Sequence, residues 1–171
     1  MTTRLVRTCC AAALACAVAR GAAAQSPGAD SADARADNMW HASARMGSLA
    51  FGVPQQFSAS VLLGMERYWG AGTRRFTQMW YVRLEPGLAA SRVALGVGAW
   101  QLADQGGGAT VQVAALRTYG SPWSAPKDQT YWGVEARAYV WLVGPYVGYF
   151  QQVDGRGTRD AFVSAGIAIG F

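Results

Sequence analysis

The amino-acid sequence predicts an all-β fold, an antiparallel up-and-down transmembrane β-barrel of eight strands that occupies residues 39–171. Segments of about ten residues alternate apolar and polar side chains, which is typical of strands with two different faces. Gly, Pro, Asp and Gln separate these segments. The chain after residue 24 has no apolar run of the roughly 18 residues that a membrane helix needs, so only strands could cross a membrane.

Residues 1–24 are predicted to be a removable secretory signal peptide. Arg4 and Arg7 give a basic start, an apolar run follows from Thr8 to Val18, and small residues suited to cleavage close the segment. Two alternatives stay open, namely an N-terminal membrane anchor and a lipid-attachment site at Cys16. Without this segment the chain has no cysteine and its formal net charge falls from +5 to about +2, which gives no indication of nucleic-acid binding.

Residues 25–38 are small, polar and slightly acidic, and they are expected to form a flexible periplasmic lead-in to the barrel. The remaining chain is of a size for one domain and contains no internal repeat. It has neither a CxxC motif nor a cluster of histidines, so we expect no metal site and no cofactor.

Alternation and turn residues together predict the eight strands and their connections. The strands are expected at Trp40–Gly52, Phe57–Tyr68, Phe76–Glu85, Leu88–Trp100, Thr110–Tyr119, Tyr131–Leu142, Pro145–Val153 and Ala161–Phe171. The connections are expected at Val53–Gln56, Trp69–Arg75, Pro86-Gly87, Gln101–Ala109, Gly120–Gln129, Val143-Gly144 and Asp154–Asp160.

The apolar–polar alternation that predicts the strands is clearer in some of them than in others. Residues 39–53 could alternatively begin as a short helix, because Ala and Met are not strong strand formers. In the fourth strand, Leu95 and its apolar neighbours alternate with Arg92 and small residues. In the sixth strand, Val134 lies on an apolar face and Glu135 on the opposite, charged face. Such strands have one face suited to an apolar environment and an opposite face suited to a polar environment.

The polar faces carry an equal number of acidic and basic residues among small glycines and alanines. We predict that six of these charges form a network in the lumen: Glu66, Arg83, Glu85, Arg92, Glu135 and Arg137. The interior of an eight-stranded barrel is just wide enough to be filled by side chains, and charges enclosed there must pair. The alternative is that these charges form the solvated face of a soluble sheet.

Strand length and the placement of aromatic residues favour the membrane alternative. Strands of about ten residues match a tilted membrane crossing. Aromatic residues lie near strand ends, as in the interface girdles of membrane proteins: Trp40, Tyr68, Trp69, Phe76, Trp100, Trp132, Trp141 and Phe171. Of these, only Trp69, Phe76, Trp132 and Phe171 have the parity of the lipid-facing side.

The last strand resembles the C-terminal assembly signal of bacterial outer-membrane β-barrel proteins. Its residues in the positions of that motif are Val163, Ala165, Ile167, Ile169 and Phe171. The resemblance implies a Gram-negative outer membrane, recognition of this strand by the barrel assembly machinery, and contact with outer-membrane lipids and lipopolysaccharide. It also implies that the last strand pairs with the first and that both termini are periplasmic. The short connections Val53–Gln56 and Pro86-Gly87 would then be outer loops, which depart from the usual greater length of outer loops.

The expected function is a structural or surface-interaction role, without enzymatic activity. A lipid-modifying enzyme would need an activated nucleophile, and the only histidine, His41, is instead expected at the periplasmic rim, with Ser43 on the same face. Glu135 and Arg137 could line a narrow channel but are expected to be structural. A soluble periplasmic barrel that binds an apolar ligand is the third alternative, and the oligomeric state stays open.

Basic residues in the connections could hold lipopolysaccharide phosphates if they lie at the outer surface, although loop charges are more often merely solvated. The expected topology places Lys127, Arg156 and Arg159 on the outer side and Arg74 and Arg75 on the periplasmic side.

Overall fold

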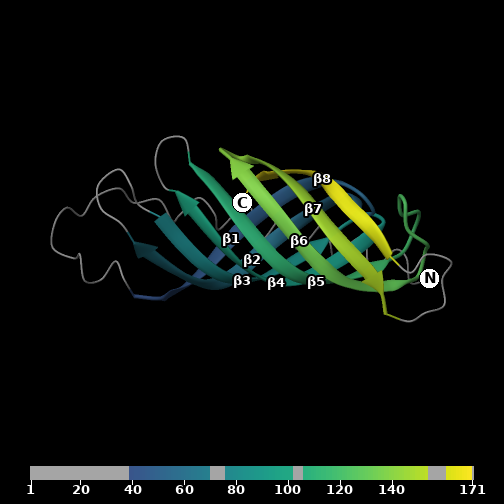
Figure 1. Cartoon of the computed structure of the whole chain (residues 1–171), viewed down its shortest axis with the longest axis horizontal. Coiled ribbons are helices and arrows are strands. Elements are labelled where there is room, and N and C mark those ends of the chain that lie inside the picture. Colours follow the sequence, from purple (N-terminus) through teal and green to yellow (C-terminus); the bar gives the residue numbers. More distant parts are fainter. Residues whose placement is uncertain (1–38, 70–75, 102–105, 154–160, 171) are drawn as a thin grey trace. The chain divides into compact units, whose positions relative to one another are not determined.

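The computed structural model describes residues 39–69, 76–101, 106–153 and 161–170. These residues form an antiparallel barrel of eight strands, which confirms the predicted all-β fold class (Figure 1). The strands are β1 (His41–Gly52), β2 (Gln56–Trp69), β3 (Phe76–Pro86), β4 (Ala90–Gln101), β5 (Gly107–Thr118), β6 (Thr130–Val140), β7 (Val143–Gln152) and β8 (Ala161–Gly170). The predicted signal peptide and lead-in over residues 1–38 lie outside the described residues.

Each strand pairs with its neighbour in the chain, and β8 pairs with β1 to close the barrel. In that closing pair, Ser48–Gly52 lies against Gly166–Gly170. Closure satisfies backbone groups that an open sheet would leave at its edges. Residues 41–52 form a strand throughout, so the alternative of a short initial helix is wrong. Pairing with β2 on both sides of a bulge outweighs the weak β-propensity of its alanines.

A β-bulge interrupts the pairing of β1 with β2 between Met46 and Leu49. A bulge inserts an extra residue, so the even-numbered residues of β1 face outward before it and inward after it. Trp40 therefore lies on the outward parity, 38% exposed, and its predicted inward parity is wrong. Gly47 lies in the bulge because a Cβ there would come within 2.1 Å of Ser60 Oγ.

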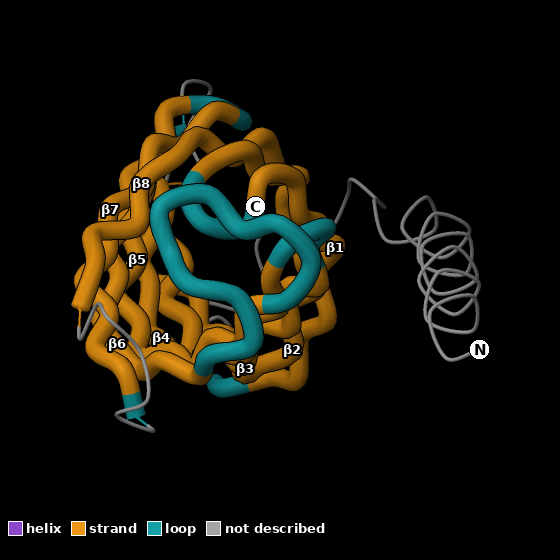
Figure 2. The backbone as a smooth tube through the Cα atoms, turned by 90° about the vertical axis from the view of Figure 1, so that its right-hand side faces the viewer, coloured by secondary structure: helices purple, strands orange, loops and turns teal. Residues whose placement is uncertain are grey.

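The barrel has two structurally different ends. At the first, which we call the loop end, lie the turn 53–55, the turn 87–89 and the connection 119–129. At the other, the terminal end, β1 begins, β8 ends and the turn 141–142 joins β6 to β7. Viewed along the barrel, the strands enclose the interior and a long loop lies across the near end (Figure 2).

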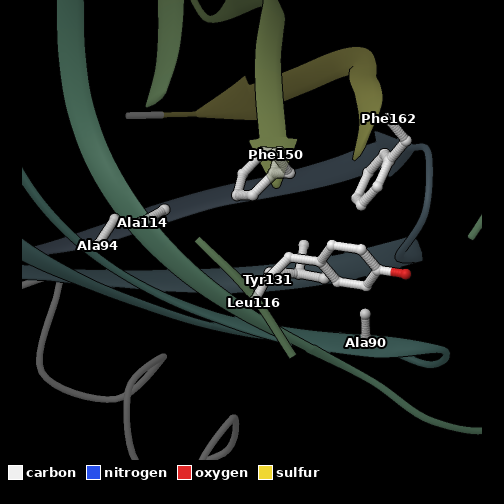
Figure 3. Close-up of a cluster of buried hydrophobic side chains, with 7 residues drawn as sticks. All are labelled: Ala90, Ala94, Ala114, Leu116, Tyr131, Phe150 and Phe162. Atoms are coloured by element: carbon white, nitrogen blue, oxygen red, sulfur yellow. The ribbon is translucent and has the colours of Figure 1, made fainter. Parts of the chain in front are cut away.

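Inward side chains form three apolar clusters, of which the two larger lie toward opposite ends of the barrel and the smallest contains Ala50, Tyr146 and Ala168. In the cluster nearer the loop end, Phe162 stacks on Phe150 and meets Tyr131 edge-on (Figure 3). The members of this cluster are Ala90, Ala94, Ala114, Leu116, Tyr131, Phe150 and Phe162. The cluster nearer the terminal end contains Leu62, Met79, Tyr81 and Trp100. Inward glycines make room for these rings, since a Cβ on Gly96 would lie 2.6 Å from the hydroxyl of Tyr81. Charged residues occupy the level between the two larger clusters.

Candidate functional site: a charged interior and an apolar outer wall

The charged level of the interior is organised around the carboxylate of Glu135 on β6. Arg137 Nε donates to Glu135 Oε1 over 2.6 Å, and Gln112 Nε2 donates to the same oxygen over 2.8 Å. Arg92 of β4 donates to the second oxygen, Oε2. One carboxylate therefore joins side chains from three neighbouring strands, which fixes the mutual positions of β4, β5 and β6 from inside.

Glu85 of β3 extends the charged cluster across the lumen. Arg137 Nη2 donates to Glu85 Oε2 over 2.7 Å, and Ser58 Oγ donates to Glu85 Oε1 over 2.9 Å. The side chains of Arg137, Glu85 and Glu135 have no exposed area, and neither has that of Arg92. Charges removed from water in this way need good partners, because an unpaired buried charge is costly.

Aromatic side chains cover the flat faces of the buried guanidinium groups. The centre of the Arg137 guanidinium lies 4.7 Å from the ring of Tyr146, and that of Arg92 lies 5.5 Å from the same ring. Arg83 is fully buried, lies 5.4 Å from the Tyr81 ring and donates to the hydroxyl of Tyr139 over 3.3 Å. Stacking on aromatic rings suits guanidinium groups in the absence of water.

The structure places all six predicted lumen charges inside the barrel, each with no more than 7% of its area exposed. It corrects the grouping for Glu66, whose contacts lie near the terminal end and apart from the joined residues Glu85, Arg92, Glu135 and Arg137. Arg83 donates its hydrogen bond to Tyr139 rather than to a carboxylate. Arg45 Nη2 donates to Glu66 Oε2 over 2.5 Å, and the hydroxyl of Tyr68 donates to Glu66 Oε1 over 2.8 Å. The reason is register, since Glu66 lies opposite His41 at the start of β1, whereas Glu85 and Glu135 lie deeper in the barrel.

Sequence reasoning missed several partners of the charged cluster. The alternation of β5 places Gln112 on the inward face, so this partner was recoverable from the pattern. Gln55, which accepts a hydrogen bond from Arg92, lies in a turn, and no periodic signal marks it as inward. The inward position of Arg45 could not be read from the alternation of β1, because the bulge changes which residues of this strand face inward.

His41 lies where the terminal end meets solvent, half-buried rather than enclosed. Its ring centroid is 5.2 Å from that of Tyr68, on the neighbouring strand. The carboxylate of Glu66, opposite His41 in register, already accepts hydrogen bonds from Arg45 and Tyr68. The geometry around this histidine is that of a packed rim residue.

The connection 119–129 closes over the loop end of the barrel. The backbone N–H of Trp123 donates to Pro54 O over 3.3 Å, and the Trp123 ring packs edge-on against Phe51 at 5.4 Å. Gln56 Nε2 donates to Ser121 O over 2.5 Å. At the base of the loop, the hydroxyl of Tyr119 donates to Gly87 O over 2.5 Å. These contacts attach the loop to the two short turns at this end, so the three connections form one cover (Figure 2).

The outer wall of the barrel is apolar over most of its height. Val134, Leu95 and Ile167 are between 50% and 61% exposed. Strand positions with outward parity that carry polar side chains lie near the strand ends: Arg67, Gln78, Ser91, Gln101, Arg117, Thr130 and Gln151. The burial pattern alternates without interruption along β5, β6 and β7, so the greasy side chains face out and the charged ones in. Water-soluble barrels have the opposite arrangement.

The aromatic residues predicted as a girdle divide between the two faces. Trp69, Trp132 and Trp141 are between 49% and 62% exposed on the outside, whereas Trp100 is buried in the lumen. Trp69 stacks on Phe76 at 4.8 Å across the end of β2 and β3. Of the residues predicted for the assembly signal, Val163, Ala165, Ile167 and Ile169 all face outward, and Phe171 lies outside the described residues.

Of the basic residues predicted in connections, the structure describes Lys127. Lys127 lies exposed in the cover over the loop end. Arg74, Arg75, Arg156 and Arg159 lie outside the described residues.

The fold and its interior define the class of the protein as an eight-stranded antiparallel β-barrel with a charged, side-chain-filled lumen. Comparisons with models of protein families, with curated protein sequences and with solved structures found no match for this chain. Within the described ranges, no helix is long and apolar enough to pass through a bilayer. The same ranges contain no group of three His, Cys, Asp or Glu side chains arranged to hold a metal ion.

Proposed function

We propose that this protein is an exported outer-membrane β-barrel of a Gram-negative bacterium, with a structural or surface-interaction role. The observation that carries the proposal is the outer wall, where exposed apolar side chains cover the middle of the barrel and the outward polar side chains lie near strand ends. Such a wall would be unfavourable in water and matches the hydrocarbon band of a bilayer. The strands are 10 to 14 residues long, which is sufficient for a tilted crossing.

The proposed orientation has the terminal end in the periplasm and the cover of connections on the outside. This orientation agrees with the resemblance of β8 to the assembly signal of outer-membrane barrels. The outward face of β8, from Val163 to Ile169, would be the surface that the barrel assembly machinery recognises. The surrounding partners would be outer-membrane lipids and lipopolysaccharide.

Fractionation tests the membrane location directly. When the full chain is expressed in a Gram-negative host, we expect the protein in the outer-membrane fraction after density-gradient separation. Closed membrane barrels resist unfolding by dodecyl sulfate, so the unboiled protein should migrate faster than the boiled protein on gels. Recovery in the soluble periplasmic fraction without detergent would contradict the proposal and favour a soluble barrel that binds an apolar ligand.

The lumen is proposed to be closed to ions rather than to conduct. Arg92, Arg137, Glu85 and Glu135 are held by one another and by aromatic rings at the middle level, and apolar clusters lie on both sides. We expect the purified protein in planar bilayers to give no reproducible single-channel current, even at high salt concentration. Reproducible channels that change with Glu135→Gln would overturn the closed lumen and support the narrow channel.

The proposed role is not enzymatic. His41 packs against Tyr68, and the nearby carboxylate of Glu66 is engaged by Arg45, so these groups are arranged for structure rather than for activating Ser43. Loss of a lipid-modifying activity of the purified protein on His41→Ala would contradict this view.

A further inference from the structure

A row of three polar side chains crosses the outer wall near the loop end. Ser91 of β4, Arg117 of β5 and Thr130 of β6 are register partners, so they lie side by side on three adjacent strands. Arg117 is exposed, and its Nη1 donates to Thr130 Oγ1 over 2.8 Å. On the other side of Arg117, Ser91 Oγ lies 2.8 Å from the hydroxyl of Tyr119, with which it shares a hydrogen bond. This row is the place on the wall near the loop end where the described strands direct a charge outward.

An apolar furrow begins directly below this row. The next row toward the middle of the wall consists of Val93, Ala115 and Trp132, which are also register partners. Ala115 is the smallest of the three, so it forms a low floor between two larger side chains. The furrow is lined by outward side chains that include Val82, Val93, Leu95, Val113, Ala115 and Trp132.

We propose that this face binds one phosphate-bearing membrane lipid, with its phosphate on Arg117 and an acyl chain in the furrow. The inference rests on the proposed membrane location. A guanidinium group presents paired donors that match phosphate oxygens, and the hydroxyl of Thr130, which accepts from Arg117, can add a further donor. Trp132 lies at the level where an indole ring would meet the interface between headgroups and acyl chains. The positive charge above an apolar furrow is complementary to a lipid rather than to an uncharged hydrocarbon.

The outward arginine at the opposite end has a different environment and provides a matched control. Arg67 Nη2 donates to Gln78 Oε1 over 2.9 Å, and its guanidinium lies 5.1 Å from the ring of Trp40. One donor nitrogen of Arg67 therefore has a protein acceptor, and an indole ring lies over its guanidinium group, so less of this group is open to a phosphate. Arg67 and Arg117 have the same charge and lie at opposite ends of the wall, but only Arg117 lies above the furrow.

Native mass spectrometry of the folded full chain in mild detergent tests the site. The probes are dioleoyl phosphatidic acid and dioleoylglycerol, which share acyl chains and differ by the phosphate. We expect the protein to retain one phosphatidic acid, Arg117→Gln to lower its retention roughly tenfold, and Arg67→Gln to leave it unchanged. Equal retention by Arg117→Gln, or equal retention of dioleoylglycerol, would overturn the proposal.

A second pair of variants tests the furrow separately from the charge. Ala115→Phe should fill the floor of the furrow and lower phosphatidic acid retention several-fold, on the order of fivefold. Ala138→Phe, also at an exposed outward alanine but nearer the terminal end, should not. If Ala115→Phe binds as the unmodified protein does, the acyl-chain part of the site is wrong.

The heat-dependent gel migration of each preparation separates two kinds of failure. A protein that migrates as a folded barrel and fractionates with the outer membrane, yet binds phosphatidic acid independently of Arg117, refutes this lipid site alone. A protein recovered in soluble form without detergent refutes the membrane location and the lipid site together.

Discussion

Replacing Glu135 with alanine is expected to lower the free energy of unfolding by about 3–5 kcal/mol, the cost of removing one partner from a buried ion pair. The carboxylate of Glu135 accepts hydrogen bonds from Arg92, Arg137 and Gln112. The side chains of Glu135, Arg92 and Arg137 have no exposed area. Loss of this carboxylate would leave two arginines in the lumen with fewer partners. Arg137 would keep Glu85, whereas Arg92 would lose its carboxylate.

Urea unfolding of the protein in lipid vesicles, followed by tryptophan fluorescence, measures this effect. Glu66→Ala serves as the control, because Glu66 pairs with Arg45, whose side chain is 30% exposed, near the terminal end. Because solvent reaches Arg45, the loss of Glu66 should cost less stability than the loss of Glu135. If the two variants lost equal stability, the charged level around Glu135 would not be the tight core of the lumen that the geometry indicates.

Replacing Val134 with lysine is expected to lower the free energy of unfolding in lipid vesicles by about 2–4 kcal/mol, as for a lysine at the middle of a bilayer. Val134 faces outward near the middle of β6, and its register partners Val113 and Tyr149 are also exposed on the wall. A lysine there would place an ammonium group among acyl chains. In water the same substitution on an exposed strand face would change stability by no more than about 0.5 kcal/mol.

The matched control for this substitution is Gln151→Lys, on the outward face of β7 near the loop end. A lysine at the interface costs only about 0–1 kcal/mol, because its long side chain reaches the headgroups. Both variants are compared by vesicle-based urea unfolding and by the fraction that migrates as folded barrel before boiling. Equal, small effects at the two positions would be evidence that water rather than lipid surrounds the wall.

The two substitutions test opposite sides of one wall. A charge removed from the inside should destabilise the barrel, and a charge added to the outside should do the same. A soluble barrel of the usual kind would respond in the reverse manner, since its charges face water and its apolar side chains form the core. The pair of results therefore distinguishes the membrane proposal from the soluble alternative without knowledge of any ligand.

The sequence by itself determined the fold class, the number of strands and the face on which most side chains lie. This was possible because alternation is a local property: successive side chains of a strand point to opposite faces wherever the strand is placed. Val134 and Glu135 thus reveal their opposite environments from adjacent positions in the chain. The strand ends were less well determined, and β5 begins at Gly107, before its predicted start at Thr110.

Only the tertiary structure decided which charges meet. Glu135 pairs with Arg92 on a strand that is not its neighbour, and Glu66 pairs with Arg45 rather than with the deeper cluster. Both outcomes depend on the register of every strand pair around the closed barrel, and the sequence of one strand does not specify the register of the others. The bulge in β1 and the docking of Trp123 on the turn at Pro54 depend on the same closure. Contacts between residues distant in sequence exist only once every strand has its place, and those contacts fill the lumen.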